Sequence, residues 1–164
     1  MNTTKTLLAA LALSSAVFSA AVSPAFAVNE LNTSPGLTTA GAPLALHGYD
    51  PVAYFTDAKP TIGNSKLVVA NKGASYYFAN QANLDIFKAN PGKFEPQYGG
   101  YCAFGVSIGK KFDGDPNHWK IVDGKLYVNL NADIAEKFNA DVPGALKKAE
   151  GNWPTIQDKA PTAL

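Results

Sequence analysis

The chain of 164 residues carries 14 basic side chains, all of them lysines, against 13 acidic ones, and its formal net charge is +1 at pH 7. Proteins that read nucleic-acid sequence rely on arginine and a basic surface, and anionic membranes attract basic clusters, so this balance argues against both partners. The single cysteine, Cys102, excludes a disulfide within one chain, and Met1 is the only thioether that could serve a soft metal.

Residues 1–27 have the three parts of a secretory signal peptide. Lys5 is their only charge, an apolar run from Leu7 to Val22 follows, and the small residues of Ala25-Phe26-Ala27 suit a signal peptidase. The alternative is a retained membrane anchor, but the run is short for a span of about 20 residues. We therefore expect cleavage after Ala27 and a mature protein in the periplasm or outside the cell, no longer attached to the membrane.

Residues 28–43 are rich in Asn, Thr, Ser, Gly and Pro and have few side chains to bury. This composition is typical of a flexible leader. The next segment, 44–55, is apolar and aromatic but is interrupted by Gly48 and Pro51. It therefore favours two short strands, or a strand and a turn.

A β-hairpin is predicted over residues 66–78, because Asn71-Lys72-Gly73 separates two apolar arms. Asn80 follows at an N-cap position and predicts a helix that Pro91-Gly92 would end.

A second hairpin is predicted within residues 118–129, since Asp123-Gly124 is a preferred pair for a tight turn. Helices are then expected after Asn131, as an N-cap, and from Pro143. The whole order predicts an α+β fold, with a small antiparallel sheet from two β-hairpins and three to four short helices. The domain is expected over residues 44–154, followed by a frayed tail, 155–164.

Three segments carry a family resemblance: GYDPVAYF (48–55), YYFANQANLDIFKANPGKFEPQYGGYCAFGVSIG (76–109) and DPNHWKIVDGKLYVN (115–129). They resemble the YHS-domain family, and most closely its exported, single-domain bacterial members, over nearly all of residues 45–153. The resemblance implies a metal-binding module, with copper the leading candidate and zinc the second. Related modules hold zinc through several thiols, which one cysteine cannot do within a chain. Exported relatives labelled selenoproteins point instead toward redox chemistry.

Cys102 allows two interpretations. Gly99 and Gly100 could let the chain aim backbone N–H groups at the sulfur, and a helix beginning near Tyr101 would add its positive end. A thiolate stabilised in this way could bind copper, attack a disulfide or become a sulfenic acid. Alternatively, the thiol is a small apolar side chain in a core, next to aromatic residues such as Tyr98.

His47 and His118 are the only imidazoles, and each borders a predicted strand. If folding brings them to Cys102, they could complete a copper or zinc site, within one chain or shared in a homodimer. Each could equally be an ordinary surface histidine. Residues that could line such a site are Tyr49, Asp50, Tyr98, Gly99, Gly100 and Tyr101. Asp113 and Asp115 are interpreted as a plain turn, because a hard cation needs more oxygens.

The sequence leaves three functions open. The first is a transition-metal binding module that uses Cys102 with His47, His118 or a tyrosine. The second is a thiol redox or peroxide-sensing protein, which would need a thiol partner because the chain has no resolving cysteine. The third is an interaction domain with a structural cysteine. No Ser-His-Asp spacing or phosphate loop is present and no organic cofactor is implied, so binding is favoured over catalysis.

Overall fold

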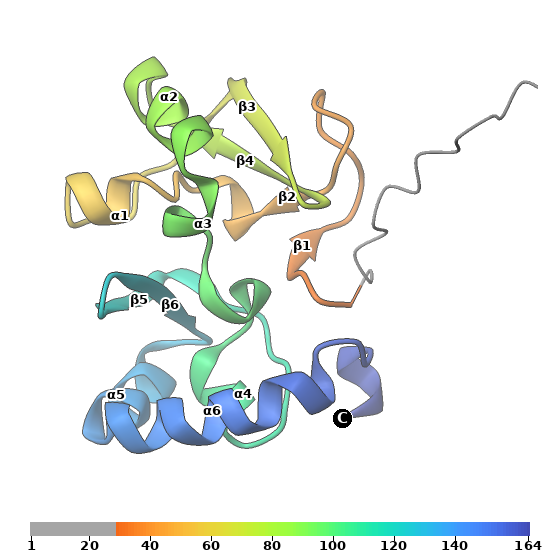
Figure 1. The fold of residues 1–164 in the computed structure, drawn as a ribbon, viewed down its shortest axis with the longest axis vertical. Coiled ribbons are helices and arrows are strands. Elements are labelled where there is room, and N and C mark those ends of the chain that lie inside the picture. Colours follow the sequence, from red (N-terminus) through yellow and green to blue (C-terminus); the bar gives the residue numbers. More distant parts are fainter. Residues whose placement is uncertain (1–28) are drawn as a thin grey trace, which may run out of the picture.

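The computed structural model describes residues 29–164 (Figure 1), so the predicted signal peptide lies outside the described residues. None of the helices in this range has the length and apolar character needed to cross a membrane. The strands are β1 (Thr33–Ser34), β2 (Leu44–Ala45), β3 (Asn64–Asn71), β4 (Ala74–Phe78), β5 (Asp115–Val122) and β6 (Lys125–Asn129). The α-helices are α1 (Ala53–Thr56), α2 (Gln81–Ala89), α3 (Pro91–Phe94), α4 (Ala103–Ser107), α5 (Ala132–Ala140) and α6 (Val142–Ile156). The 3-10 helices are η1 (Leu46–Gly48), η2 (Gln97–Gly100) and η3 (Pro161–Ala163).

The α+β class and both predicted hairpins are confirmed, but the hairpins belong to two separate sheets. One sheet has the order β1-β2-β4-β3, in which β2 and β4 are parallel and the other pairs antiparallel; the other sheet contains only β5 and β6. The prediction of a single antiparallel sheet with three to four helices is therefore too simple. The difference arises because residues 33–45 supply two extra short strands and because the segment after β2 is helical.

The two hairpin turns lie where the sequence places them. Their central residues, Lys72-Gly73 and Asp123-Gly124, all have positive φ, at 47°, 86°, 50° and 71°. Positive φ at both central residues matches the right-handed twist of the flanking strands, which is why glycine in the second position predicts such turns. Both hairpin predictions rest on this local chemistry.

The predicted helix starts are also confirmed. The side-chain oxygen of Asn80 accepts the backbone N–H of Asn83 at 2.9 Å, and Asn131 caps α5 through Ile134 at 3.0 Å. Each bond satisfies one of the N–H groups that a helix leaves without a partner in its first turn. Pro143 lies in the first turn of α6, as predicted.

The segment 44–55 begins with a strand, β2, and continues through a 3-10 helix and a turn into α1, so the predicted strand and turn fit better than two strands, and Asp50 explains where α1 starts. Its Oδ1 accepts the backbone N–H groups of Val52 (2.8 Å) and Ala53 (3.3 Å), at the start of α1. Its Oδ2 accepts from the N–H of Ala79 (2.9 Å) and the side-chain amide of Asn83 (2.7 Å). Asp50 is fully buried, so the prediction that it lines a binding site is wrong: the carboxylate connects the start of α1 to α2.

The segment predicted as a flexible leader is packed from residue 29 onward. β1 pairs with β2, and the backbone N–H of Asn32 donates to the carbonyl of Gly99 at 2.9 Å. Gly99 has φ +61°, and a Cβ on it would lie 1.8 Å from the carbonyl oxygen of Glu30. Only glycine therefore permits this contact. The prediction of a flexible leader is wrong because it uses only the composition of the segment and not the surface of the domain on which the segment packs.

The predicted frayed tail is packed as well. α6 continues to Ile156, which is buried, and Lys111 donates from its Nζ to the carbonyls of Gln157 and Lys159, the latter at 2.8 Å. The same Nζ donates to the carbonyl of Asn29 at 2.7 Å. Lys111 therefore joins both ends of the described chain, and the domain extends over residues 29–164 and not 44–154.

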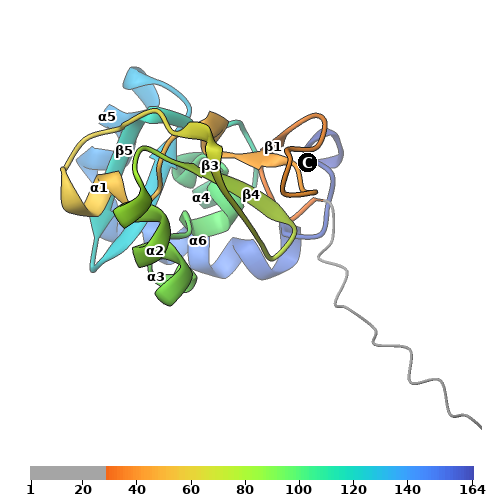
Figure 2. The same cartoon turned by 90° about the horizontal axis from the view of Figure 1, so that it is seen from above.

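The molecule has an upper and a lower half in Figure 1. The four-stranded sheet and α1–α3 form the upper half, and the β5–β6 hairpin lies below them with α4–α6 packed beneath it; Figure 2 shows the same arrangement from above. A buried cluster joins the halves, with Leu46 and Tyr54 from one side and Leu126 and Val128 from the other. The site described next lies along this junction.

Candidate functional site

Cys102 is the N-cap residue of α4, and its side chain has 0% exposure. Its Sγ accepts the backbone N–H of Gly105 at 3.3 Å, and its thiol lies 3.8 Å from Oδ1 of Asn129. A helix therefore begins at the thiol, as the sequence predicts. The donors come from the residues after the cysteine, however, and not from Gly99 and Gly100.

Burial raises the pKa of the Cys102 thiol above its ordinary value. The backbone N–H groups of Gly105, Leu130 and Phe104 act in the opposite direction, because they favour the thiolate, but they do not outweigh the burial. The side chain is therefore a protonated thiol at neutral pH. A thiol in this state is a weak nucleophile and a weak metal ligand.

We expect Cys102 in the folded protein to react with a disulfide reagent such as DTNB on the order of 100-fold more slowly than in the unfolded chain. The reason is the combination of full burial with a raised pKa. Absorbance at neutral pH with and without urea measures both rates. As the pH rises, the reaction rate of the unfolded chain should increase before that of the folded protein, because the thiol pKa is higher in the folded protein. Rapid stoichiometric labelling of the native protein would show that the sulfur is accessible.

The other residues predicted around the sulfur pack elsewhere. The carbonyl of Gly100 accepts the side-chain amide of Asn32 at 3.0 Å, and the Tyr101 hydroxyl donates to the Leu31 carbonyl at 3.3 Å. The Tyr98 ring packs against the rings of Tyr127 and Trp153. Together with Gly99, these residues contact the N-terminal segment or pack among aromatic rings. They do not form a binding site at the Cys102 thiol.

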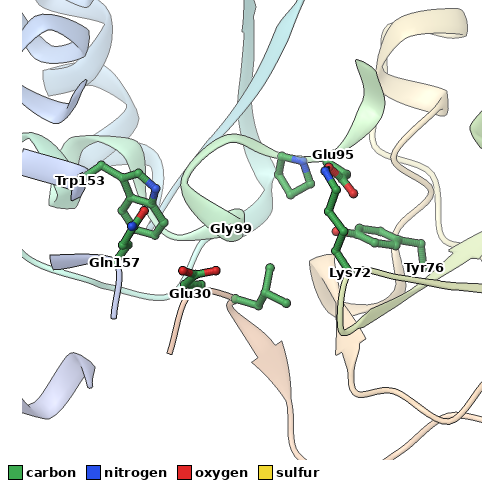
Figure 3. A pocket seen from close by; sticks show the side chains of 9 residues that line it. Glu30, Lys72, Tyr76, Glu95, Gly99, Trp153 and Gln157 are labelled. Atoms are coloured by element: carbon green, nitrogen blue, oxygen red, sulfur yellow. The ribbon is translucent and has the colours of Figure 1, made fainter. Parts of the chain in front are cut away.

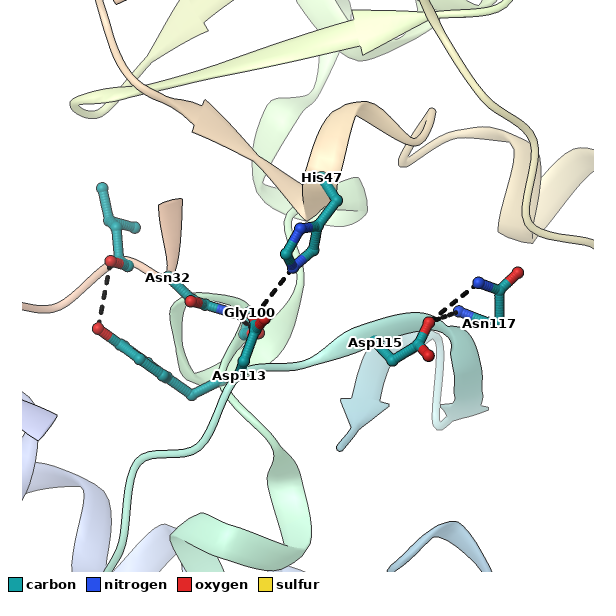
Figure 4. A network of polar contacts seen from close by, with 8 residues as sticks. Asn32, His47, Gly100, Asp113, Asp115 and Asn117 are labelled. Carbon is teal, nitrogen blue, oxygen red and sulfur yellow. Dashed lines mark hydrogen bonds and ion pairs between the residues drawn. The ribbon is translucent and has the colours of Figure 1, made fainter. Parts of the chain in front are cut away.

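His47 lies at an open cleft between the two halves (Figure 4). The cleft has a volume of about 370 Å³, and its lining includes His47, Tyr49, Asp113 and Asp115. Nε2 of His47 is 2.9 Å from Oδ1 of Asp113, and the side-chain amide of Asn32 donates to the same oxygen at 2.7 Å. We call this feature the His47 cleft. Tyr49, predicted from the sequence as a residue that could line a metal site, is among the residues that line this cleft.

His118 borders the same cleft through Asp115. The Nε2 of His118 is 3.6 Å from Oδ2 of Asp115, and Oδ1 of Asp115 accepts from the backbone N–H (2.8 Å) and the side-chain amide (3.0 Å) of Asn117. The Asn117 amide lies 3.4 Å from the Tyr49 hydroxyl. Each imidazole of the chain thus lies beside a carboxylate of the cleft lining, although only His47 is itself part of that lining. Sequence reasoning missed Asp113 and Asp115, although two acids around a glycine just before a histidine are a usable signal.

The structure does not bring Cys102 and the two histidines into one ligand set. Within residues 29–164, no three His, Cys, Asp or Glu side chains are already arranged to hold a metal ion. The nearest arrangements are the two His–Asp pairs, whose members are partly exposed. Any metal at the cleft would take imidazole nitrogens and carboxylate oxygens, with the thiol outside its reach.

Comparisons of the chain with protein-family models, with curated proteins and with solved structures find no match in any of the three. The resemblance to YHS-domain proteins therefore stays a prediction from the three quoted segments.

Proposed function

We propose that the protein is a small exported binding module that takes up a transition metal at the His47 cleft, copper(II) first and zinc second. The observation that carries this proposal is that His47 and Asp113 line one cleft as a pair, and that Asp115 of the same lining contacts His118, the other imidazole of the sequence. Imidazole suits both copper and zinc, and copper(II) accepts mixed nitrogen and oxygen ligands. The proposal keeps His47 and His118 as ligands and replaces Cys102 by Asp113 and Asp115.

Because the paired side chains of His47 and Asp113 are exposed, small rotations of these side chains would be enough to admit a metal ion. His47 and Asp113 are 44% and 56% exposed, so water can reach both and neither is fixed in a core. A metal would replace the contact between their Nε2 and Oδ1 atoms. Water molecules would complete its coordination, which is typical of accessible sites. Binding requires neutral imidazole, so it should weaken as the pH falls.

The predicted secretory signal and the resemblance to exported YHS-domain proteins support a location in the periplasm or outside the cell. These compartments are oxidising, and copper(II) is the oxidised form of the metal. A site of imidazoles and carboxylates suits that form better than a thiolate site does.

We expect the purified protein to bind one copper(II) ion per chain, with His47→Ala weakening binding at least about tenfold and Cys102→Ser leaving it unchanged. Isothermal titration calorimetry against a competing chelator measures both constants, and a parallel zinc titration ranks the two metals. His118→Ala tests the second imidazole. Equal affinity in wild type and His47→Ala, or loss of binding in Cys102→Ser alone, would contradict the site.

A thiol redox function is the second candidate, and one observation favours it. The backbone N–H groups of Gly105, Leu130 and Phe104 all act to stabilise a thiolate at Cys102. If local opening exposes the sulfur, peroxide would convert the thiolate to a sulfenic acid with release of hydroxide, and a partner thiol would be needed to reduce it. Dimedone labelling after mild peroxide treatment tests this; the absence of an adduct removes the candidate.

A further inference from the structure

A second cavity lies where the N-terminal segment, the β3–β4 hairpin and α6 come together (Figure 3). Its volume is about 180 Å³, and its apolar walls include Leu31, Tyr76, Pro96 and Trp153. This cavity and the His47 cleft have no lining residue in common. We call it the Tyr76 pocket.

Tyr76 contributes a hydroxyl group to the lining of this pocket. Tyr76 is 3% exposed, yet among residues 29–164 no hydrogen bond to its hydroxyl is formed. In Figure 3 the hydroxyl points from β4 into the cavity. Burial, with a smaller contribution from Glu95, raises the pKa of Tyr76, so the group stays a neutral O–H. The hydroxyl is not one of the fully buried polar atoms without a partner, so water in the pocket can reach it, and a ligand that enters the pocket can take the place of that water.

The charges that line the pocket favour a cation. Lys72 and Glu95 form an ion pair at 2.9 Å, so their two charges largely cancel. Glu30 also lines the pocket, and no lysine or histidine among the described residues lies within ion-pair distance of it. The lining therefore contains two carboxylates and one ammonium group. The Lys111 ammonium group also acts on Glu30, but it donates its hydrogen bonds to three backbone carbonyls, so the Glu30 carboxylate can still accept a hydrogen bond from an ammonium group in the pocket.

The size and the walls define the rest of the ligand. An apolar cavity of about 150 Å³ is enough to hold benzene, so the Tyr76 pocket has room for one six-membered ring and a short substituent. The indole of Trp153 and the ring of Tyr76 offer aromatic surface against which a flat ring packs. A cation beside these rings would gain further stabilisation.

We propose that the Tyr76 pocket binds an amine that carries a single aromatic ring, with the ring between the Trp153 and Tyr76 sides and the ammonium group between the Tyr76 hydroxyl and the Glu30 carboxylate. The ammonium group then donates one hydrogen bond to the hydroxyl oxygen of Tyr76 and another to the carboxylate of Glu30. The contact between Gly99 and Glu30 keeps the N-terminal segment in place as one wall of the pocket.

Benzylamine and benzoate test the proposal as probes of matched size and opposite charge. The full chain labelled with nitrogen-15 has two indole N–H signals, from Trp119 and Trp153. We expect benzylamine to shift the Trp153 signal saturably and to leave that of Trp119 in place, while benzoate shifts neither. Absence of a saturable shift at Trp153, or equal binding of benzoate, would overturn the proposal.

Two variants locate the probe in the pocket. Tyr76→Phe keeps the ring and removes only the hydroxyl, so benzylamine affinity should fall about fivefold. Tyr77→Phe, one residue along β4 and outside the pocket lining, is the matched control and should leave the affinity unchanged. Glu30→Gln lies in the N-terminal segment and should reduce the affinity without unfolding the core. Wild-type affinity in both Tyr76→Phe and Glu30→Gln would overturn the assignment.

Discussion

Replacing Asp50 by asparagine lowers the free energy of unfolding by about 3–4 kcal/mol. The buried carboxylate accepts four hydrogen bonds, two on each oxygen, and has no other function that the structure shows. An asparagine has only one oxygen, so its NH₂ group would face either the N–H groups at the start of α1 or those of Ala79 and Asn83. Two buried donors would then lose their acceptor, which is the costly case for a hydrogen bond.

Urea unfolding, followed by circular dichroism, measures this effect. Asp57→Asn is the matched control, because Asp57 is exposed at the end of α1, and it should change stability by less than about 0.5 kcal/mol. A similarly small loss for Asp50→Asn would mean that the surrounding backbone finds other acceptors. The metal titration should remain normal in any Asp50 variant that still folds, since Asp50 does not line the His47 cleft.

Replacing Lys111 by methionine destabilises the protein by about 2–4 kcal/mol and frees both ends of the chain. The Lys111 side chain is 4% exposed, and its ammonium group donates to three backbone carbonyls while lying 5.0 Å from the Tyr101 ring centre and 5.4 Å from that of Trp153. Burial lowers the pKa of Lys111, with Asp158 and Glu30 acting in the opposite direction. Methionine keeps the contact with the rings but leaves the carbonyls without a donor.

Hydrogen exchange distinguishes this role from general destabilisation. In Lys111→Met, amides of residues 29–34 and 157–164 should exchange faster by a larger factor than those of β4 or α2. The matched control is Lys110→Met, because Lys110 is the neighbouring lysine and is exposed. Uniform acceleration across the whole chain, or no change at the two ends, would contradict the proposed connection.

Local chemistry explains what the sequence predicts correctly. The turn at Asp123-Gly124 and the caps at Asn80 and Asn131 depend on a few neighbouring residues, and all of them form as expected. The packed N-terminal segment depends instead on Gly99, about 70 residues away, and its own composition suggests a flexible leader. Contacts of this range cannot be inferred from one segment at a time.

The candidate site shows the same division. His47 and His118 are recognisable because imidazoles are scarce in this chain; His47 lines the cleft, and His118 contacts Asp115 of its lining. The location of Cys102 at a helix start is predictable, but its full burial depends on the packing of Asn129 and its neighbours against it. Asp113 is interpreted from the sequence as part of a plain turn, because its partner, His47, is 66 residues away.

The contact of Lys111 with both chain ends has a consequence for the order in which the molecule is assembled. Lys111 can complete its three carbonyl contacts only after residues 157–159 have been synthesised, long after Asn29. The joint attachment of both segments to Lys111 is therefore a late event in folding.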